Sequence, residues 1–493
     1  MFAAVLCAVQ LAEGTALYFS AGCVGFILIA AVAFNLGGGL SRVSGAYVFF
    51  YSMLVVIMGL TYKALLGEPA QSNLQDPVTT IEVFLAGITG MLGAVIISQQ
   101  FTRNQGLLQN ILKESRMYRS SVGCILVGIF GQSAITLLGE SGGALVSAFN
   151  QINLLTPLGI IIGGMYEIRR TGGKRSTNLI MILAGAYDLF LGGILAFSKG
   201  GLFTAPLCWL LPVCALGFRL SARQVLFTCA ALFIAIYYLV PYSQYGRNEV
   251  TPEMTRSQRL DVSISLLKEP DKTRQAYNEG FKYLEDEGLS YGGYFNKPQG
   301  FMDRLQFVSV DDSLIAFTQR GDRTVGIGPV TEAFANTIPR VFWPNKPAPH
   351  FSGNFYSHEM GGLAEDDTTT GISFSPTGEA FHMDKWVGVL VIAPILWFLT
   401  FLVFDSLFGD LRASPWGLLI LVQLAHVAPE GGLGGLVRFL TFGVETMVFC
   451  AVFATWVAPI FAIPILGSDR RTVAPEFSLP VDLNQQVDLK DPA

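Results

Sequence analysis

Eleven long apolar runs restrict what this chain can fold into more than any other feature of its sequence. They lie at 15–36, 44–66, 78–101, 120–139, 143–166, 177–198, 202–218, 223–241, 386–408, 413–428 and 437–461. A helix of about 20 apolar residues crosses the hydrocarbon core of a bilayer, and lipid offers no partner to unpaired backbone groups. A shorter apolar segment, 2–12, precedes these runs. We therefore expect an all-α polytopic membrane protein with about 11–12 transmembrane helices.

The composition of the 493 residues agrees with this class of protein. Apolar residues make up 51% of the chain, charged residues only 14%, and the mean hydropathy is +0.48. A soluble protein carries about 25% charged residues. The net charge of −5 says little, because the charges are segregated along the chain, and no basic face indicates a nucleic-acid partner. All seven cysteines lie in or beside apolar runs, so we expect packing residues rather than disulfides.

The charges of the short loops indicate on which side of the membrane each loop lies, because basic residues favour the cytoplasmic side. Lys and Arg gather at 102–119, 167–176, 219–223 and 470–471. The loops that alternate with these hold acidic residues and no Lys or Arg, and they lie at 67–77, 139–143 and 429–436. The turn near Lys199 is the one exception. The pattern predicts that the first set of loops is cytoplasmic and the second set is outside.

One polar insertion, 242–385, interrupts the apolar runs, and the same alternation predicts that it lies outside the cytoplasm, in the periplasm of a bacterium. It concentrates the charged residues and holds all but one of the four histidines and no cysteine. We therefore expect four parts: transmembrane helices at 1–241, an outer loop domain at 242–385, transmembrane helices at 386–466, and a disordered cytoplasmic tail at 467–493.

The insertion has helical spacing in its first two thirds. Helices are predicted over Thr251–Leu267, over Lys272–Glu287 and within 299–319, where apolar residues fall on one helical face. A short helix is expected to end near Thr337, because three prolines follow it. The remainder, His350–Asp384, is rich in Gly, Ser, Thr and Asp and is expected to be an ordered loop.

Two strings near the end of the insertion are the most distinctive in the chain. They are IPRVFWPNKP at 338–347 and SPTGEAF, followed by WVG, within 375–388. Together with Arg304 in MDRL and Arg438 in GGLVRF, they resemble the loop-to-membrane signature of the O-antigen polymerase, or oligosaccharide repeat-unit polymerase, family. The polytopic layout with one large outer loop late in the chain agrees with that family. The Asn-Phe pair that often ends the second string in the family is absent here.

The resemblance implies an integral-membrane glycosyltransferase of the GT-C-like architecture in a bacterial inner membrane. Its donor would be a glycan on undecaprenyl pyrophosphate and its acceptor a repeat unit on the same lipid. The acceptor hydroxyl would attack the anomeric carbon of the donor and release undecaprenyl pyrophosphate. The resemblance further implies membrane lipid and a chain-length regulator protein as partners, no nucleic acid and no cofactor or metal.

Such a reaction needs fixed cations, because negative charge grows on the leaving pyrophosphate and guanidinium groups suit phosphate best. The candidates are Arg340, Arg438, Arg304 and Lys346. Arg340 lies in a stiff, aromatic segment that suits the membrane interface, where it would otherwise only contact lipid headgroups. Arg438 lies at the edge of a predicted span, where it faces a cavity or forms a structural ion pair.

The attacking hydroxyl needs a base or an orienting acceptor. Glu379 is the first candidate, followed by His382, His358 and Asp384, and His426 is a weaker one. The alternative for Glu379 is a structural role, since acidic residues also favour the start of a helix. The acidic run 365–367 is interpreted as solvated loop rather than a cation site, and no histidine spacing is typical of zinc.

Three other functions remain open on the sequence. A ligase that moves a finished glycan to another acceptor would use the same chemistry. A transporter or flippase of lipid-linked glycans would place polar residues through the span centres, where this chain has mainly apolar ones. A scaffold without catalysis would make Arg340, Arg438 and Glu379 individually dispensable. If the chain is a polymerase, Arg340→Ala or Arg438→Ala should abolish long glycan chains while the protein still inserts.

Overall fold

The structure is a computed structural model, and it describes residues 1–103, 105–138, 152–251, 254–286, 293–338, 343, 345–346, 350–351, 353–363 and 371–467. Within these ranges the regular structure is entirely helical. Six helices have the length and composition to cross a membrane, and they are Leu17–Leu36, Val43–Leu65, Pro77–Phe101, Ala222–Glu249, Pro376–Ala413 and Gly432–Phe461. The prediction of an α-helical, multi-pass membrane protein is confirmed at this level.

The remaining predicted spans are also helical where the structure describes them, but they are shorter or more polar. The helices before the insertion are α1 (Phe2–Ala12), α2 (Leu17–Leu36), α3 (Val43–Ser52), α4 (Met58–Leu65), α5 (Pro77–Phe101), α6 (Glu114–Leu138), α8 (Leu155–Arg170), α9 (Leu179–Asp188), α10 (Lys199–Ala215), α11 (Ala222–Ile234) and α12 (Val240–Glu249). Those after it are α19 (Ala393–Phe408), α20 (Pro415–Glu430), α21 (Gly432–Arg438), α22 (Val444–Val452), α23 (Ala458–Phe461) and α24 (Ile463–Leu466).

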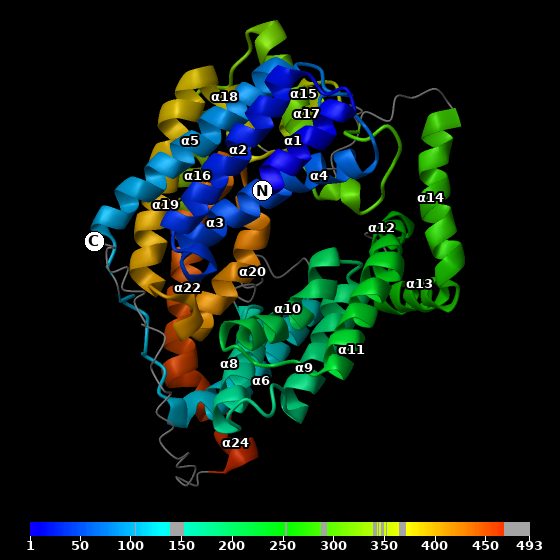
Figure 1. Ribbon diagram of the computed structural model, residues 1–493. Helices are drawn as coiled ribbons and strands as arrows, with labels where there is room; N and C mark the ends of the chain where they lie inside the picture. Colours follow the sequence, from blue (N-terminus) through cyan, green and yellow to red (C-terminus); the bar gives the residue numbers. More distant parts are fainter. Residues whose placement is uncertain are drawn as a thin grey trace, which may run out of the picture.

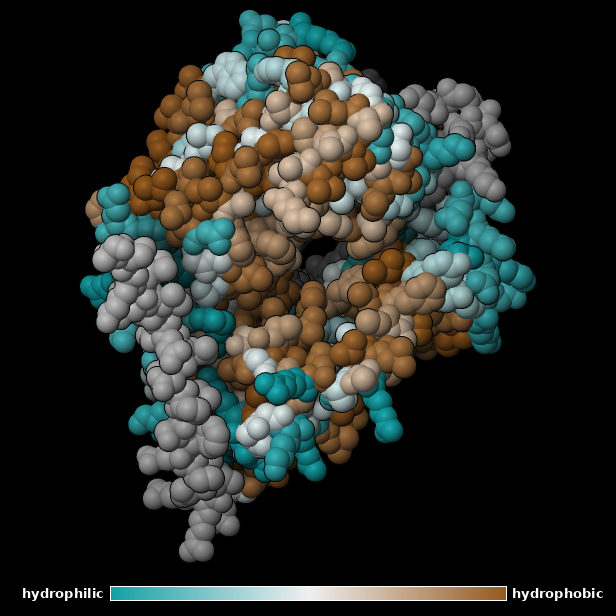
Figure 2. All heavy atoms as spheres, viewed as in Figure 1, coloured by the Kyte–Doolittle hydropathy of each residue, from teal (hydrophilic) through white to brown (hydrophobic). Residues whose placement is uncertain are grey.

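The helices form two groups, which Figure 1 shows one above the other. The upper group contains α1–α5 together with α15–α19, and the lower group contains α6 and α8–α12. Helix α20 joins the two groups, since it contacts α3 in the upper one and α8 and α10 in the lower one. The space-filling view from the same side shows a hollow between the groups, with apolar residues along much of its rim (Figure 2).

The insertion contains the helices α13 (Arg256–Lys268), α14 (Pro270–Asp286), α15 (Val308–Gly321), α16 (Gly328–Thr337), α17 (Gly353–Glu359) and α18 (Pro376–Val387), with a 3₁₀ turn, η6, at Met302–Arg304. The prediction of a loop over His350–Asp384 is therefore wrong at α17 and α18. Helix α18 has a complete start signal: Ser375 caps it by accepting a hydrogen bond from the Gly378 N–H, and Pro376 takes the first helical position. The helix then kinks at Asp384 and Lys385.

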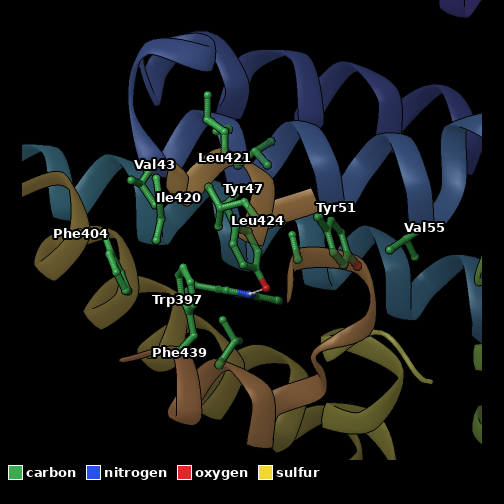
Figure 3. Packing of buried hydrophobic residues seen from close by; sticks show 14 of the residues in the cluster. Val43, Tyr47, Tyr51, Val55, Trp397, Phe404, Ile420, Leu421, Leu424 and Phe439 are labelled. Atoms are coloured by element: carbon green, nitrogen blue, oxygen red, sulfur yellow. Dashed lines mark hydrogen bonds between the residues drawn. The ribbon is translucent and has the colours of Figure 1, made fainter. Parts of the chain in front are cut away.

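The core of the upper group connects α18 to the membrane helices. Tyr47, Tyr51 and Trp397 are fully buried and lie together (Figure 3). The Trp397 Nε1–H donates to the Tyr47 hydroxyl over 3.3 Å, so both polar atoms are satisfied in an apolar environment. The Tyr51 hydroxyl is 2.5 Å from Thr377 Oγ1 in α18. The first turn of α18 is thus attached to the buried core of the upper group.

Lys63 ties the insertion to the N-terminal helices. Its ammonium group is buried at the end of α4, where it donates to the carbonyl of Tyr294 over 2.7 Å and to that of Ser72, and it lies 4.0 Å from the centre of the Tyr294 ring. Lys63→Met is expected to leave the Ser72 carbonyl without its donor and the Tyr294 carbonyl with only the Asn73 amide, 3.2 Å away, and to lower the stability by about 2 kcal/mol, since an unsatisfied buried acceptor costs about 1–3 kcal/mol. A thermal unfolding curve in detergent, compared with that of the exposed Lys272→Met, would measure this loss. Equal midpoints for both variants would contradict the anchoring role.

Candidate functional site

A cavity of about 280 Å³ lies where the end of the insertion meets the C-terminal helices. Its walls come from α16, α17, the segment 371–374, α18 and the junction of α20 with α21. Its polar lining residues are Glu332, Asn336, Tyr356, Ser373, Glu379, Glu430 and Arg438, and the rings of Phe351 and Phe374 also line it. Two residues that the sequence analysis singled out, Glu379 and Arg438, therefore line the same cavity.

Glu379 is buried and held by hydrogen bonds on both of its carboxylate oxygens. The Tyr356 hydroxyl donates to Oε1 over 2.8 Å, and the Leu433 N–H donates to Oε2. The second contact requires Gly432, whose φ is +57° and where a Cβ atom would lie 2.2 Å from Glu379 Oε2. The carboxylate is thus fixed between α17 and the beginning of the helix that contains α21.

Arg438 lies at the end of α21, on the cavity wall, and it interacts electrostatically with Glu379. Its side chain is exposed, and it forms no ion pair with an acid of the described residues. A guanidinium group without a bound carboxylate retains its donors for a ligand. The cavity therefore places an available cation close to a fixed anion.

Two further carboxylates face the cavity. Glu332 accepts hydrogen bonds from the backbone N–H groups of His350 and Phe351, over 2.9 Å and 3.4 Å. Glu430 pairs with His426 one helical turn earlier, with 2.8 Å between Nδ1 and Oε2. His426 thus contributes to the site only through Glu430. Across the described ranges, no three His, Cys, Asp or Glu side chains are placed to bind one metal ion.

His382, predicted as a base, is fully buried, is not among the residues that line the cavity, and contacts Thr318 in α15 and Glu359 in α17. The Thr318 hydroxyl donates to the carbonyl of Leu314 over 2.7 Å, so it must accept the Nδ1–H of His382 over 2.8 Å. Nε2 then faces Glu359 Oε2 at 3.6 Å. Because two lone pairs repel, this contact is attractive only with a proton on the imidazole or on the carboxyl. We interpret His382 as a residue that positions α17, which carries Tyr356.

The other predicted site residues that the structure describes are not among those that line the cavity. His358 is half-buried in α17, and Arg304 is exposed in η6. The Lys346 ammonium group donates to the carbonyls of Asn336 and Ile338, both over 2.9 Å, so it caps the end of α16. Asp384 lies at the kink of α18. Arg340 and the acidic run 365–367 fall outside the described residues.

The structure adds Tyr356, Glu332 and Glu430, which were not selected from the sequence. Tyr356 was missed because its segment was predicted to be a loop. Glu430 stands in the string APEGG. The two glycines after it are a sequence signal for a close backbone contact, and in the structure the Glu379 carboxylate lies against Gly432. Nothing in the sequence around Glu332 distinguishes it from a solvated residue on a short helix.

Asp311 lies next to the start of α18 and is expected to make the stability of the protein depend on pH. It is fully buried, accepts a hydrogen bond from the Ser375 N–H over 2.9 Å on Oδ1, and finds no hydrogen-bond partner for Oδ2 among the described residues. Burial raises the pKa of Asp311 from 3.8 to about 7, and the charges of Asp312 and Glu379 add to the effect. A carboxyl whose pKa is raised on folding stabilises the protein below its unfolded pKa, and this stabilisation is lost as the pH rises to about 7.

Asp311→Asn is therefore expected to reduce this pH dependence, since an amide does not ionise. The difference between the pKa of Asp311 in the unfolded protein and that in the folded protein corresponds to at most roughly 4 kcal/mol of stability between acid and neutral pH. Thermal unfolding of the two proteins between pH 5 and pH 8 would measure it. The wild type should lose stability with rising pH in this window, and the variant should lose less. Parallel curves would show that Asp311 does not titrate there.

A second cavity, of about 250 Å³, lies between α6, α8 and the start of α20. Lys113, Glu114 and Arg169 line it, and none of the predicted site residues does.

Comparison of the chain with models of known protein families, with curated proteins and with solved structures found no match. The cavity of Glu379 and Arg438 is therefore the candidate site on its geometry and on the sequence pattern alone.

Proposed function

We propose that this protein is a polymerase of lipid-linked oligosaccharide repeat units. The observation that carries the proposal is the meeting of Glu379 and Arg438 in one cavity, from α18 and α21, with two more carboxylates and three aromatic rings around them. Carboxylates and amides accept and donate hydrogen bonds to sugar hydroxyls, and aromatic rings give an apolar face for the sugar ring. A cavity with this lining suits a glycan more than a purely apolar ligand.

In the proposed reaction, the oxygen of the acceptor hydroxyl bonds to the anomeric carbon of the donor sugar. The bond from that carbon to the diphosphate breaks, and its electron pair goes to the diphosphate oxygen. Arg438 stabilises the negative charge that grows on this leaving group. The fixed carboxylate of Glu379 stabilises the positive charge that grows on the sugar ring, as carboxylates do in glycosidic bond cleavage.

The hydroxyl proton requires an acceptor in the same cavity. Both oxygens of Glu379 already accept one hydrogen bond, which weakens this carboxylate as a base but leaves further lone pairs to orient the hydroxyl. Glu332 and Glu430 offer the other carboxylates. We propose that Glu379 orients the attacking hydroxyl and that a neighbouring carboxylate of the cavity receives its proton.

The test is a transfer assay with the purified protein in lipid nanodiscs and lipid-linked repeat units as the only substrate. A ladder of products that differ by one repeat unit is the expected result. A single transfer to a different acceptor, without a ladder, would instead identify a ligase. If the repeat units cross a proteoliposome membrane and are not joined, the protein is a transporter and the proposal fails.

A further inference from the structure

The second cavity, of about 250 Å³, is the place where two basic loops of the sequence pattern meet. Lys113 comes from the loop 102–119 and directly precedes α6. Arg169 comes from 167–176 and lies in the last turn of α8. Both line the cavity, together with Ser414 at the start of α20. The charge pattern predicts only that these loops share one side of the membrane, whereas the structure brings two of their cations to one cavity.

The segment just before α6, which forms part of the cavity wall, is attached to the C-terminal helices. The Leu107 N–H donates to the carbonyl of Ser406 over 3.0 Å. The Leu108 N–H donates to the carbonyl of Leu407 over 2.8 Å. The carbonyl of Leu108 in turn accepts the Nε1–H of Trp416, a fully buried residue that lines the cavity, over 3.0 Å. The cavity is therefore preformed, which lowers the ordering cost of binding a ligand.

The cations of the cavity keep hydrogen-bond donors for a ligand. Arg169 donates from Nη1 to Glu114 Oε1 over 3.2 Å, and Glu114 also lines the cavity. The Nη2 group of Arg169 and the ammonium group of Lys113 have no hydrogen-bond or ion-pair partner among the described residues. The lining thus holds two cations and one acid, a net charge of +1. The remaining donors favour a ligand with a negative charge.

Apolar side chains next to the cations indicate what kind of anion fits. Leu112, Met117, Met165 and Trp416 are part of the lining. A free phosphate ion gains nothing from an apolar wall, whereas the phosphate of a lipid is joined to an apolar part. The volume is below the range of about 300–1,000 Å³ that encloses a drug-sized ligand, so the cavity accommodates a headgroup while the acyl chains stay outside. Basic pockets between transmembrane helices on the cytoplasmic side bind anionic headgroups in this way.

We propose that the second cavity binds the phosphate group of an anionic phospholipid from the leaflet on the predicted cytoplasmic side. The phosphate lies between the Lys113 ammonium group and Arg169 Nη2, and the acyl chains lie outside, along the helices. Helix α8 contacts α20, and α20 contacts α3 in the upper group, so the bound lipid holds α6 and α8 against the helix that joins the two groups. The site is separate from the cavity of Glu379 and Arg438 and requires no particular reaction there.

Binding of dioleoylphosphatidylglycerol to the purified full chain in detergent, followed by native mass spectrometry as the lipid is titrated, tests the site. Lys113→Gln is expected to weaken the tightest binding about tenfold or more, because a contact to a charged group is lost. Arg116→Gln is the matched control, since Arg116 is an exposed cation of the same loop and is not among the cavity residues. Lys113 is exposed as well, so neither substitution should disturb folding. Equal affinities of the two variants for this lipid would overturn the inference.

A second measurement identifies the source of the phosphate. Dioleoylphosphatidylcholine has the same acyl chains and no net charge, and it is expected to bind at least tenfold more weakly than dioleoylphosphatidylglycerol. Inorganic phosphate at millimolar concentration should not displace the anionic lipid. Equal binding of the two lipids would show that the cavity does not select an anion, and displacement by inorganic phosphate would identify a soluble anion as the ligand. Either result overturns the proposal.

Discussion

Arg438→Ala is expected to abolish long glycan chains, with a fall in the rate of transfer of about 10²–10³-fold, the usual cost of removing a group that stabilises transition-state charge. The reason is that Arg438 is the cation of the cavity, beside the fixed carboxylate of Glu379, and has no ion-pair partner among the described acids. The measurement is the length distribution of the products in the nanodisc assay. Arg438→Lys should keep part of the activity, because it keeps the charge but not the planar fork.

The effect must be separated from a failure to fold. Arg438 has an exposed side chain, so the alanine variant should insert and purify like the wild type. Arg412→Ala is the matched control, since Arg412 is also exposed and sits between two C-terminal helices, paired with Asp410 at 2.7 Å. We expect wild-type chains from this control. Wild-type chains from Arg438→Ala as well would remove Arg438 from the site.

The membrane helices could be predicted from the sequence because the thickness of the bilayer fixes how long an apolar run must be. The candidate site could be predicted only in part. Glu379 and Arg438 were selected one by one, from a resemblance and from the cost of a charge near lipid. That they share a cavity follows from contacts of α21 with α16 and α18, which no local pattern encodes.

His382 shows why residue types alone mislead. It stands three residues after Glu379 in the same helix, and both were candidates for the base. In the structure, Glu379 faces Tyr356 and Leu433 at the cavity, while His382 is buried against Thr318. Which of two neighbouring residues reaches the cavity depends on how α18 is rotated against α15 and α21, and this is set by tertiary packing.

The cations show the same limit. Arg304 and Arg438 were expected to serve one pyrophosphate, because both fitted one family signature. In the structure Arg438 lines the cavity, whereas Arg304 lies in η6 and is not among the cavity residues.

Glu379→Gln is the second substitution with a large expected effect. The amide has the shape of the carboxylate, so its oxygen can still accept the Leu433 N–H, and its NH₂ group can donate to the Tyr356 hydroxyl. The fold should therefore change little, while the loss of the negative charge should slow transfer about 100-fold or more. Thermal unfolding and product length, measured on the same preparation, would separate the two effects.

Two companion variants define what Glu379 does. Glu379→Ala should lower both activity and stability, the latter by about 2–4 kcal/mol, because it leaves the Tyr356 hydroxyl and the Leu433 N–H buried without an acceptor. Tyr356→Phe should keep the fold and reduce the rate about tenfold, since the carboxylate loses one of the bonds that fix it. If Glu379→Gln produces full-length chains at the wild-type rate, the carboxylate serves only to hold the start of α21, and the cavity is not where the glycosidic bond forms.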